Sequence, residues 1–376
     1  VLKNIFDITF LNYEIYIIVF CVGVLNGLFN LSLNILTIKF YQFKYVFIEV
    51  LKSLLILLFL ITFLNYYNLE IKGYFYSYFL TFIIVNILVI FLIRKEFFYK
   101  KNIFSLSKKL IYYGSPLVLT QLGWFFMSIA DRIFINELMD KSSLGVYAIA
   151  GKFAIIISFF IEVFNRTWRP FLMREINNTN KKVSNYIFII TSRVYVSASS
   201  ILIILISLVS EFLILKLTES SYHQAYKLIP LLSWYFIFFG FFGIISSNMW
   251  KENKTAYTFI AIFISLIINI ILNILLIPKF GLNGAAYSTI FSFVILIIVS
   301  LKISQSIYKI EYPYFILFLK YLISFILSFI IINDYFESNF INLFLSLFAI
   351  LFIIYISIST SIKRNIFNKI KFRLNN

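Results

Sequence analysis

Residues 255–277 (TAYTFIAIFISLIINIILNILLI) and residues 282–304 (LNGAAYSTIFSFVILIIVSLKIS) are long apolar stretches separated by only four residues, Pro278 to Gly281. A helix needs about 20 mostly apolar residues to cross the hydrocarbon core of a bilayer. Both stretches reach that length, and because the core holds no water, their backbone groups must bond within a helix. The pair therefore predicts two adjacent membrane-spanning helices joined by a short turn.

The composition of the whole chain agrees with a membrane protein. Of the 376 residues, 61% are hydrophobic and 13% are charged, and the mean hydropathy is +0.94. A soluble domain is about 45–50% apolar and about 25% charged. These values exclude a water-soluble globule and a disordered chain. The single cysteine, Cys21, excludes a disulfide scaffold.

The same criterion of length and apolarity predicts an all-α, polytopic membrane protein with about eleven transmembrane helices. Proline supports several of the ends. Ser115 and Pro116 should begin the fourth span, Pro170 should end the fifth and Pro313 should begin the tenth. Pro230 lies inside the seventh span and predicts a kink there. The expected spans are 15–38, 45–64, 74–93, 115–136, 143–170, 186–215, 224–249, 255–277, 282–304, 313–332 and 340–361.

The basic residues indicate which loops face the cytoplasm. One alternate set of loops and the C-terminal tail together hold 21 Lys and Arg residues, and the other set holds six. The positive-inside rule makes the first set cytoplasmic, which puts the N-terminus of this chain outside and its C-terminus inside. The net charge of +17 then reflects attraction to anionic membrane lipid. It does not indicate nucleic-acid binding, because the basic residues lie between apolar blocks.

An internal repeat relates the first three spans to spans seven to nine, at an offset of about 212 residues. The repeat predicts a six-helix C-lobe at 115–304 and a partial N-lobe at 1–93, with about a hundred residues missing before Val1. Residues 94–114 are expected to form a cytoplasmic interfacial linker. Residues 305–376 are expected to form two peripheral transmembrane helices and a basic cytoplasmic tail. In such repeats the substrate path runs between the lobes.

Ionisable residues at bilayer depth usually face a cavity or a partner. Glu162 and Arg166 are four residues apart on one helical face, which favours a local ion pair. Asp131 could pair with Lys152 across the hairpin of the fourth and fifth spans. The eight residues at this depth are Lys52, Asp131, Arg132, Lys152, Glu162, Arg166, Arg193 and Lys320.

Four of these cations are candidates for a substrate cavity. Lys52 and Arg193 have no obvious acidic partner in their own spans, and Arg132 and Lys152 could project from the fourth and fifth spans. Lys320 lies in the first of the two peripheral spans. It could line a groove, or its aliphatic side chain could extend the ammonium group to water. A cavity rich in positive charge suits phosphate or acidic sugars, because charge-assisted hydrogen bonds strengthen at low dielectric.

Motifs for catalysis are not found in the sequence. It contains neither a Gly-rich nucleotide-binding loop nor a G-x-S-x-G motif, and its only histidine, His223, cannot build a metal site with others of its kind. We therefore expect no enzyme activity and no cofactor.

Five short segments resemble one family of membrane proteins. The chain is similar to the polysaccharide biosynthesis flippases of the multidrug/oligosaccharidyl-lipid/polysaccharide exporter superfamily. The segments that carry the resemblance are YGSPL (113–117), SIADRI (128–133), LGVYAIAGKF (144–153), WRP (168–170) and GLNGAA (281–286).

The resemblance implies two six-helix lobes, often with two extra C-terminal helices, and alternating access to a central cavity. It implies a cargo of undecaprenyl-diphosphate-linked oligosaccharide, moved from the cytoplasmic to the outer face of a bacterial inner membrane without nucleotide hydrolysis. Such a flippase would supply O-antigen, capsule or exopolysaccharide synthesis, alongside a polysaccharide polymerase and a chain-length regulator. This chain departs from the family at its start, where three helices of the N-lobe are not represented.

Other classes remain as alternatives. A cation-coupled drug antiporter of the same superfamily would require acidic residues in the cavity, for which Asp131 and Glu162 are the candidates. A membrane glycan polymerase or ligase would require a sizeable outer loop to hold diphosphate, and the outer loops here are short. A non-catalytic scaffold is a further alternative.

Overall fold

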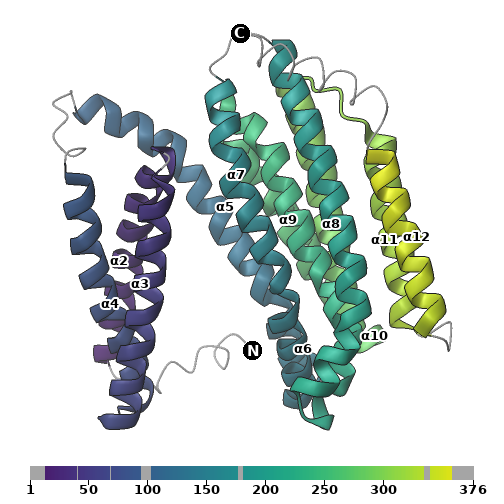
Figure 1. Ribbon diagram of the computed structural model, residues 1–376, viewed down its shortest axis with the longest axis horizontal. Coiled ribbons are helices and arrows are strands. Elements are labelled where there is room, and N and C mark those ends of the chain that lie inside the picture. The colour runs from purple at the N-terminus through teal and green to yellow at the C-terminus, as the bar shows by residue number, and fades with distance from the viewer. Residues whose placement is uncertain are drawn as a thin grey trace. The chain divides into compact units, whose positions relative to one another are not determined.

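The computed structural model describes residues 13–39, 41–67, 69–94, 103–176, 181–333 and 339–357. The chain divides into two compact units, residues 1–103 and 104–376, whose helices are labelled in Figure 1. The division falls inside the predicted linker at 94–114. The assignment of the units to lobes stays a prediction.

Unit 1 consists of three helices, α2 (Tyr13–Ile38), α3 (Gln42–Ile61) and α4 (Glu70–Ile93), and a π-helical turn (Thr62–Tyr66) extends α3. Its core is a small apolar cluster formed mainly by α2 and α4. Ile48 is the buried residue of α3. The turn before α4 is tight, because a Cβ on Gly73 would lie 3.1 Å from the Phe63 Cβ. The residues of the core are Phe29, Leu33, Leu36, Ile48, Phe82, Val85, Val89 and Ile93.

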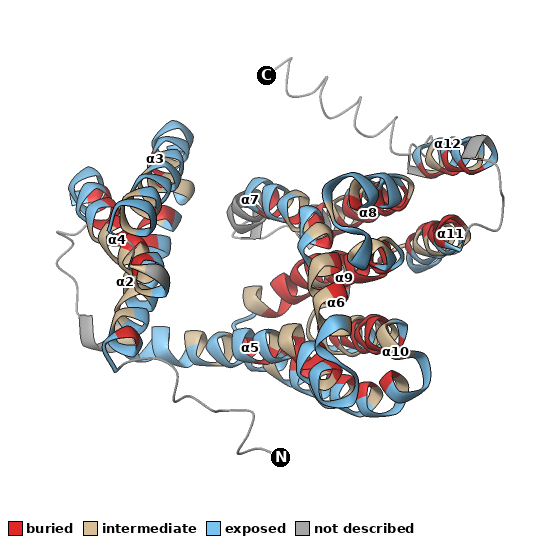
Figure 2. Cartoon of the chain, turned by 90° about the horizontal axis from the view of Figure 1, so that it is seen from below, coloured by how far each residue is buried: buried red, intermediate tan, exposed pale blue. Residues whose placement is uncertain are grey.

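Unit 2 contains the remaining helices, arranged around α9. In Figure 2 most of α9 is coloured as buried, and it packs against α6, α7, α8 and α10. The peripheral pair α11 and α12 packs on α8. The elements are α5 (Ile103–Leu138), α6 (Lys141–Ala154), α7 (Ile156–Ile176), α8 (Lys181–Leu217), a 3-10 helix (Ser220–Lys227), α9 (Leu228–Lys251), α10 (Ala256–Ile307), α11 (Tyr314–Ile332) and α12 (Asn339–Ser357).

The predicted all-α membrane architecture is confirmed. Among the described residues, nine helical segments are long and apolar enough to span a membrane, and a shorter apolar segment lies at Ile341–Ile356. One of the nine, α10, folds back at Gly281, where φ is 57° and ψ is −135°. The halves of α10, 256–280 and 282–307, correspond to the eighth and ninth predicted spans. With α10 counted as two spans, the described helices match the eleven expected from the sequence.

The hairpin within α10 depends on two glycines. Gly281 has a positive φ, a conformation that glycine adopts with little strain. Gly284 begins the return, and a Cβ there would overlap the backbone carbonyl of Leu276. The two halves of α10 can therefore approach closely at this turn.

Three predictions about proline are wrong. Pro116 does not begin a helix but lies inside α5, where the Thr120 hydroxyl donates a 2.8 Å hydrogen bond to its carbonyl. Pro170 does not end a helix, because α7 continues to Ile176. Pro230 lies in the first turn of α9, where backbone N–H groups lack intrahelical partners and proline fits without a kink. Pro313 immediately precedes α11, as expected.

Candidate functional site: a buried polar cluster in unit 2

The carboxylate of Asp131, on α5, is buried and held by neutral hydrogen-bond donors. Its Oδ2 accepts hydrogen bonds from the Tyr147 hydroxyl of α6 at 2.7 Å and from the Thr289 hydroxyl of α10 at 2.6 Å. Its Oδ1 accepts a 3.0 Å hydrogen bond from the Asn273 amide of α10. The side chain of Asp131 is 5% exposed. The carboxylate thus joins α5 to α6 and to both halves of α10.

The network continues between the halves of α10. The Asn273 amide also donates to Asn269 Oδ1 at 3.1 Å, and the Asn269 amide donates to the Ser292 hydroxyl at 3.2 Å. The Ser288 hydroxyl donates to Asn273 Oδ1. Because Asn269 and Asn273 are four residues apart they share one helical face, and the fold at Gly281 brings that face against the second half of α10.

A cavity of about 50 Å³ opens beside Asp131. Its walls carry one cation, Arg132, whose Nη1 donates a 3.3 Å hydrogen bond to the Ser128 carbonyl. Gly151 of α6 leaves room for the guanidinium, because a Cβ there would lie 3.3 Å from Arg132 Nη2. The residues that line the cavity are Met127, Ser128, Asp131, Arg132, Tyr147, Gly151, Leu232, Tyr235, Phe236 and Thr289.

The chemistry of this cluster suits a proton or a monovalent cation. A single buried carboxylate with neutral oxygen-bearing neighbours is costly to keep charged in a membrane, so binding a proton or a small cation stabilises it. Rotation of the Asn273 amide would present its oxygen to such a cation. Among the described residues no group of three His, Cys, Asp or Glu side chains lies together as a metal site would require.

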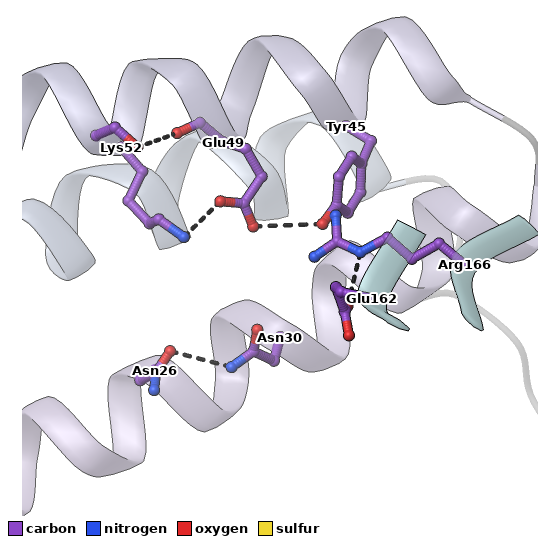
Figure 3. Close-up of polar contacts among 8 residues, drawn as sticks. Asn26, Asn30, Tyr45, Glu49, Lys52, Glu162 and Arg166 are labelled. Carbon is purple, nitrogen blue, oxygen red and sulfur yellow. Dashed lines mark hydrogen bonds and ion pairs between the residues drawn. The ribbon is translucent and has the colours of Figure 1, made fainter. Parts of the chain in front are cut away.

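The structure corrects two predictions, the partner of Asp131 and the lack of an acidic partner for Lys52. The expected ion pair between Asp131 and Lys152 is replaced by the neutral hydrogen bonds described above, and Lys152 is exposed near the end of α6. Lys52 has an acid in its own helix, since its Nζ lies 2.5 Å from Glu49 Oε2. The Tyr45 hydroxyl also donates a 3.5 Å hydrogen bond to Glu49 Oε1 (Figure 3). The long side chain of Lys52 reaches back about one turn along α3 to Glu49.

The remaining predicted residues lie in unit 2. The ion pair that was predicted from the four-residue spacing is present, with Arg166 Nε 2.7 Å from Glu162 Oε1, as Figure 3 shows. Arg193 lies on α8 close to Lys320 of α11. Of Arg132, Lys152 and Arg193, only Arg132 is among the residues that line the cavity. That these cations bind substrate stays a prediction.

The neutral members of the cluster, Tyr147, Asn273 and Thr289, were not predicted from the sequence. They carry no charge, so they do not stand out at bilayer depth as ionisable residues do. A usable signal was present, because two asparagines four residues apart interrupt an otherwise apolar span at Asn269 and Asn273. Polar residues inside a membrane helix usually face a protein interior.

Comparison with known proteins finds similarity over the part of the chain that holds these features. Residues 116–275, which include Asp131, Tyr147 and Asn273, match the MatE family model. A protein of the Lsg locus of Haemophilus influenzae is 25% identical over 154 residues, which is 40% of this chain and 38% of that protein. An uncharacterized membrane protein of Haemophilus influenzae is 26% identical over 170 residues, 43% of this chain and 42% of that protein. The matches thus span about two fifths of these relatives.

A solved structure shares the fold. The lipid II flippase MurJ, in an inward closed conformation, superposes with a TM-score of 0.58 over 94% of this chain and 75% of that chain, at 20% sequence identity. The similarity extends well beyond the segment matched by the family model. Residues 116–275 thus resemble the MatE family, and the fold of the chain resembles that of a lipid II flippase.

Proposed function

We propose that the protein is a flippase that moves undecaprenyl-diphosphate-linked oligosaccharide from the cytoplasmic to the outer face of a bacterial inner membrane, for synthesis of a surface polysaccharide. The match of residues 116–275 to the MatE family model and the fold shared with a lipid II flippase support an exporter of lipid-linked cargo. Both comparisons also agree with the expectation that the chain is not an enzyme. A polysaccharide polymerase and a chain-length regulator are its proposed partners.

The observation that carries this proposal is the cavity beside Asp131. Arg132 brings a guanidinium to its wall, and guanidinium groups bind phosphate through paired, charge-assisted hydrogen bonds. Tyr235 and Phe236 form part of the same wall and offer apolar surface. In the proposed mechanism the diphosphate binds near Arg132 while the polyprenyl tail stays in lipid.

We further propose that Asp131 couples transport to an ion gradient. Taking up a proton or a monovalent cation changes the charge of Asp131, and its hydrogen bonds link that change to α6 and to both halves of α10. A charge that crosses about 100 mV gains about 2.3 kcal/mol. That energy is large enough to bias the direction of transport.

The proposal is tested in the full-length protein by replacing Arg132. We expect Arg132→Gln to lower the outward delivery of lipid-linked glycan, measured in spheroplasts with an enzyme that modifies only outward-facing glycan, by about tenfold. The matched control is Lys279→Gln, an exposed position in the turn of α10, which should export at the parent rate. Normal export by both Arg132→Gln and Arg132→Glu would remove Arg132 from the substrate site.

A cation-coupled drug antiporter is the second candidate. Glu162 is already engaged by Arg166, so Asp131 is the acid that an antiporter of this form would use. Under this alternative, loss of the gene sensitises cells to lipophilic cations and Asp131→Asn reproduces the sensitivity. Under the flippase proposal, sensitivity is unchanged while glycan export falls.

A further inference from the structure

Two basic side chains meet between α8 and α11, outside the polar cluster. Lys320 of α11 is fully buried, and its Nζ donates a 2.7 Å hydrogen bond to the Ser197 hydroxyl of α8. Ser197 in turn donates to the carbonyl of Arg193, one turn earlier on α8, at 2.6 Å. The charge of Arg193 repels the Lys320 ammonium. Two like charges therefore occupy one interhelical contact.

The guanidinium of Arg193 is incompletely satisfied by the protein. Its Nε is buried and has no hydrogen-bond partner among the described residues. Within those residues Arg193 forms no ion pair. A buried cationic donor without an acceptor is unfavourable, and a neighbouring cation adds repulsion at low dielectric. An anion bound at Arg193 relieves both effects.

Further buried polar atoms lie toward the starts of these two helices. Asn185 Oδ1, two turns before Arg193 on α8, and the Tyr312 hydroxyl, just before α11, have no hydrogen-bond partner among the described residues. Figure 1 shows α8 and α11 beginning at the same end of unit 2. With about 1.5 Å of rise per residue, Lys320 lies about 9 Å beyond the start of α11. The basic loops predict that this end faces the cytoplasm.

We propose that this contact, the α8–α11 seam formed by Arg193, Ser197 and Lys320, binds the phosphate of a lipid headgroup from the cytoplasmic leaflet. Basic pockets between transmembrane helices on the cytoplasmic side are suited to acidic headgroups. Arg193 is half-buried, so a headgroup can reach its guanidinium, and the charge of the neighbouring Lys320 adds to the attraction. The seam is separate from the cavity at Arg132, and the proposal does not depend on the proposed cargo.

The experiment measures lipid retention by the purified full-length protein. The protein is exchanged into detergent with phosphatidylglycerol and phosphatidylethanolamine, and bound lipids are counted by native mass spectrometry. At about 1 kcal/mol per cation, Arg193→Gln and Lys320→Met should each weaken phosphatidylglycerol binding about fivefold, and the double variant about thirtyfold. Arg193→Lys, which keeps the charge, should retain most of it.

The matched control is Lys216→Gln, at the other end of α8, which should bind as the parent does. Parent-level binding by the double variant, or an equal loss in Lys216→Gln, overturns the proposal. If Lys320→Met does not fold, as judged by elution volume and helicity, the half-buried Arg193 still gives the test through its Gln and Lys variants.

The two sources of lipid phosphate are separated by competition. Undecaprenyl diphosphate is added to the protein loaded with phosphatidylglycerol. Displacement of phosphatidylglycerol by an equal concentration of undecaprenyl diphosphate identifies the seam as a binding site for the polyprenyl carrier. Retention of phosphatidylglycerol, together with its loss in the double variant, identifies a phospholipid site. Glycan export by the Arg132 variants is a separate measurement, so failure of either proposal is recognised independently.

Discussion

Among single residues, Asp131 shows how a charge is accommodated inside this molecule. Three neutral side chains donate to its carboxylate, and each comes from a different helical segment. An unsatisfied buried polar group costs about 1–3 kcal/mol. The neutral donors are therefore as important to the cluster as the acid itself.

We predict that Asn273→Leu lowers thermal stability by about 1–3 kcal/mol, because Asp131 Oδ1 loses its donor while remaining buried. The variant is measured by thermal unfolding in detergent. Asn333→Leu is the control, since the exposed Asn333 amide donates to the Phe329 carbonyl of its own helix. In the Asp131→Leu background the cost of Asn273→Leu should shrink. An undiminished cost would show that Asn273 acts through contacts other than Asp131.

The sequence revealed the charged half of this site and concealed the neutral half. Asp131 and Arg132 are conspicuous because ionisable residues are rare in apolar spans. Thr289 is not conspicuous, since a hydroxyl can bond its own helix, and its role depends on which helical faces meet. Lys52 was misjudged for a related reason: a flexible side chain selects its partner from local geometry, and Glu49 was within reach.

Among the elements, α10 shows how closely two helical halves can pack. Its sequence predicts the two spans from length and apolarity, but the closeness of the turn depends on the missing side chain at Gly284. The neighbouring atom is a backbone carbonyl of Leu276, which cannot move as a flexible side chain would. The buried Gly284 is therefore sensitive to any substitution that adds a Cβ.

We predict that Gly284→Ala destabilises the protein by about 1–3 kcal/mol, as expected for an added methyl without space. Gly23→Ala on α2 is the matched control, because a Cβ there has nothing within 4 Å. That control should be neutral or slightly stabilising, since alanine favours helices. Both are followed by thermal unfolding, and equal effects would contradict the packing at the α10 turn.

The start of α6 gives a pH-dependent prediction. The backbone N–H of Ser143 donates a 2.6 Å hydrogen bond to Asp140 Oδ1, and this contact lowers the pKa of Asp140 below its usual value. The carboxylate therefore stabilises the folded state above its unfolded-state pKa, and the contribution is lost as the pH falls through the lowered pKa. Asp140→Ala should lower the melting temperature at neutral pH and have little effect at pH about 2. The same loss at both pH values would exclude the cap.

At the scale of the whole molecule, the sequence predicted the eleven helical segments because the bilayer leaves the backbone few alternatives. Helix ends were less predictable. The helix α5 runs through Pro116, since loss of one backbone hydrogen bond is tolerated within a long packed helix.

The orientation of the chain stays a prediction and is tested by labelling. In a Cys21→Ser background, cysteines are placed at Lys254 and Lys279, which are exposed at opposite ends of the first half of α10. We expect a membrane-impermeant maleimide added to intact spheroplasts to label position 279 and not position 254. Labelling after lysis should reach both. The reverse pattern in intact spheroplasts would invert the topology.

The convergence of several helical segments on the carboxylate of Asp131 has a mechanical consequence. A proton bound to this carboxylate weakens the hydrogen bonds that join α5 to α6 and to the α10 hairpin. Tightly packed segments held at a shared point tend to switch between discrete arrangements and not to deform gradually. Under the proposed coupling, a single protonation at Asp131 would change the contacts of α5, α6 and both halves of α10 together.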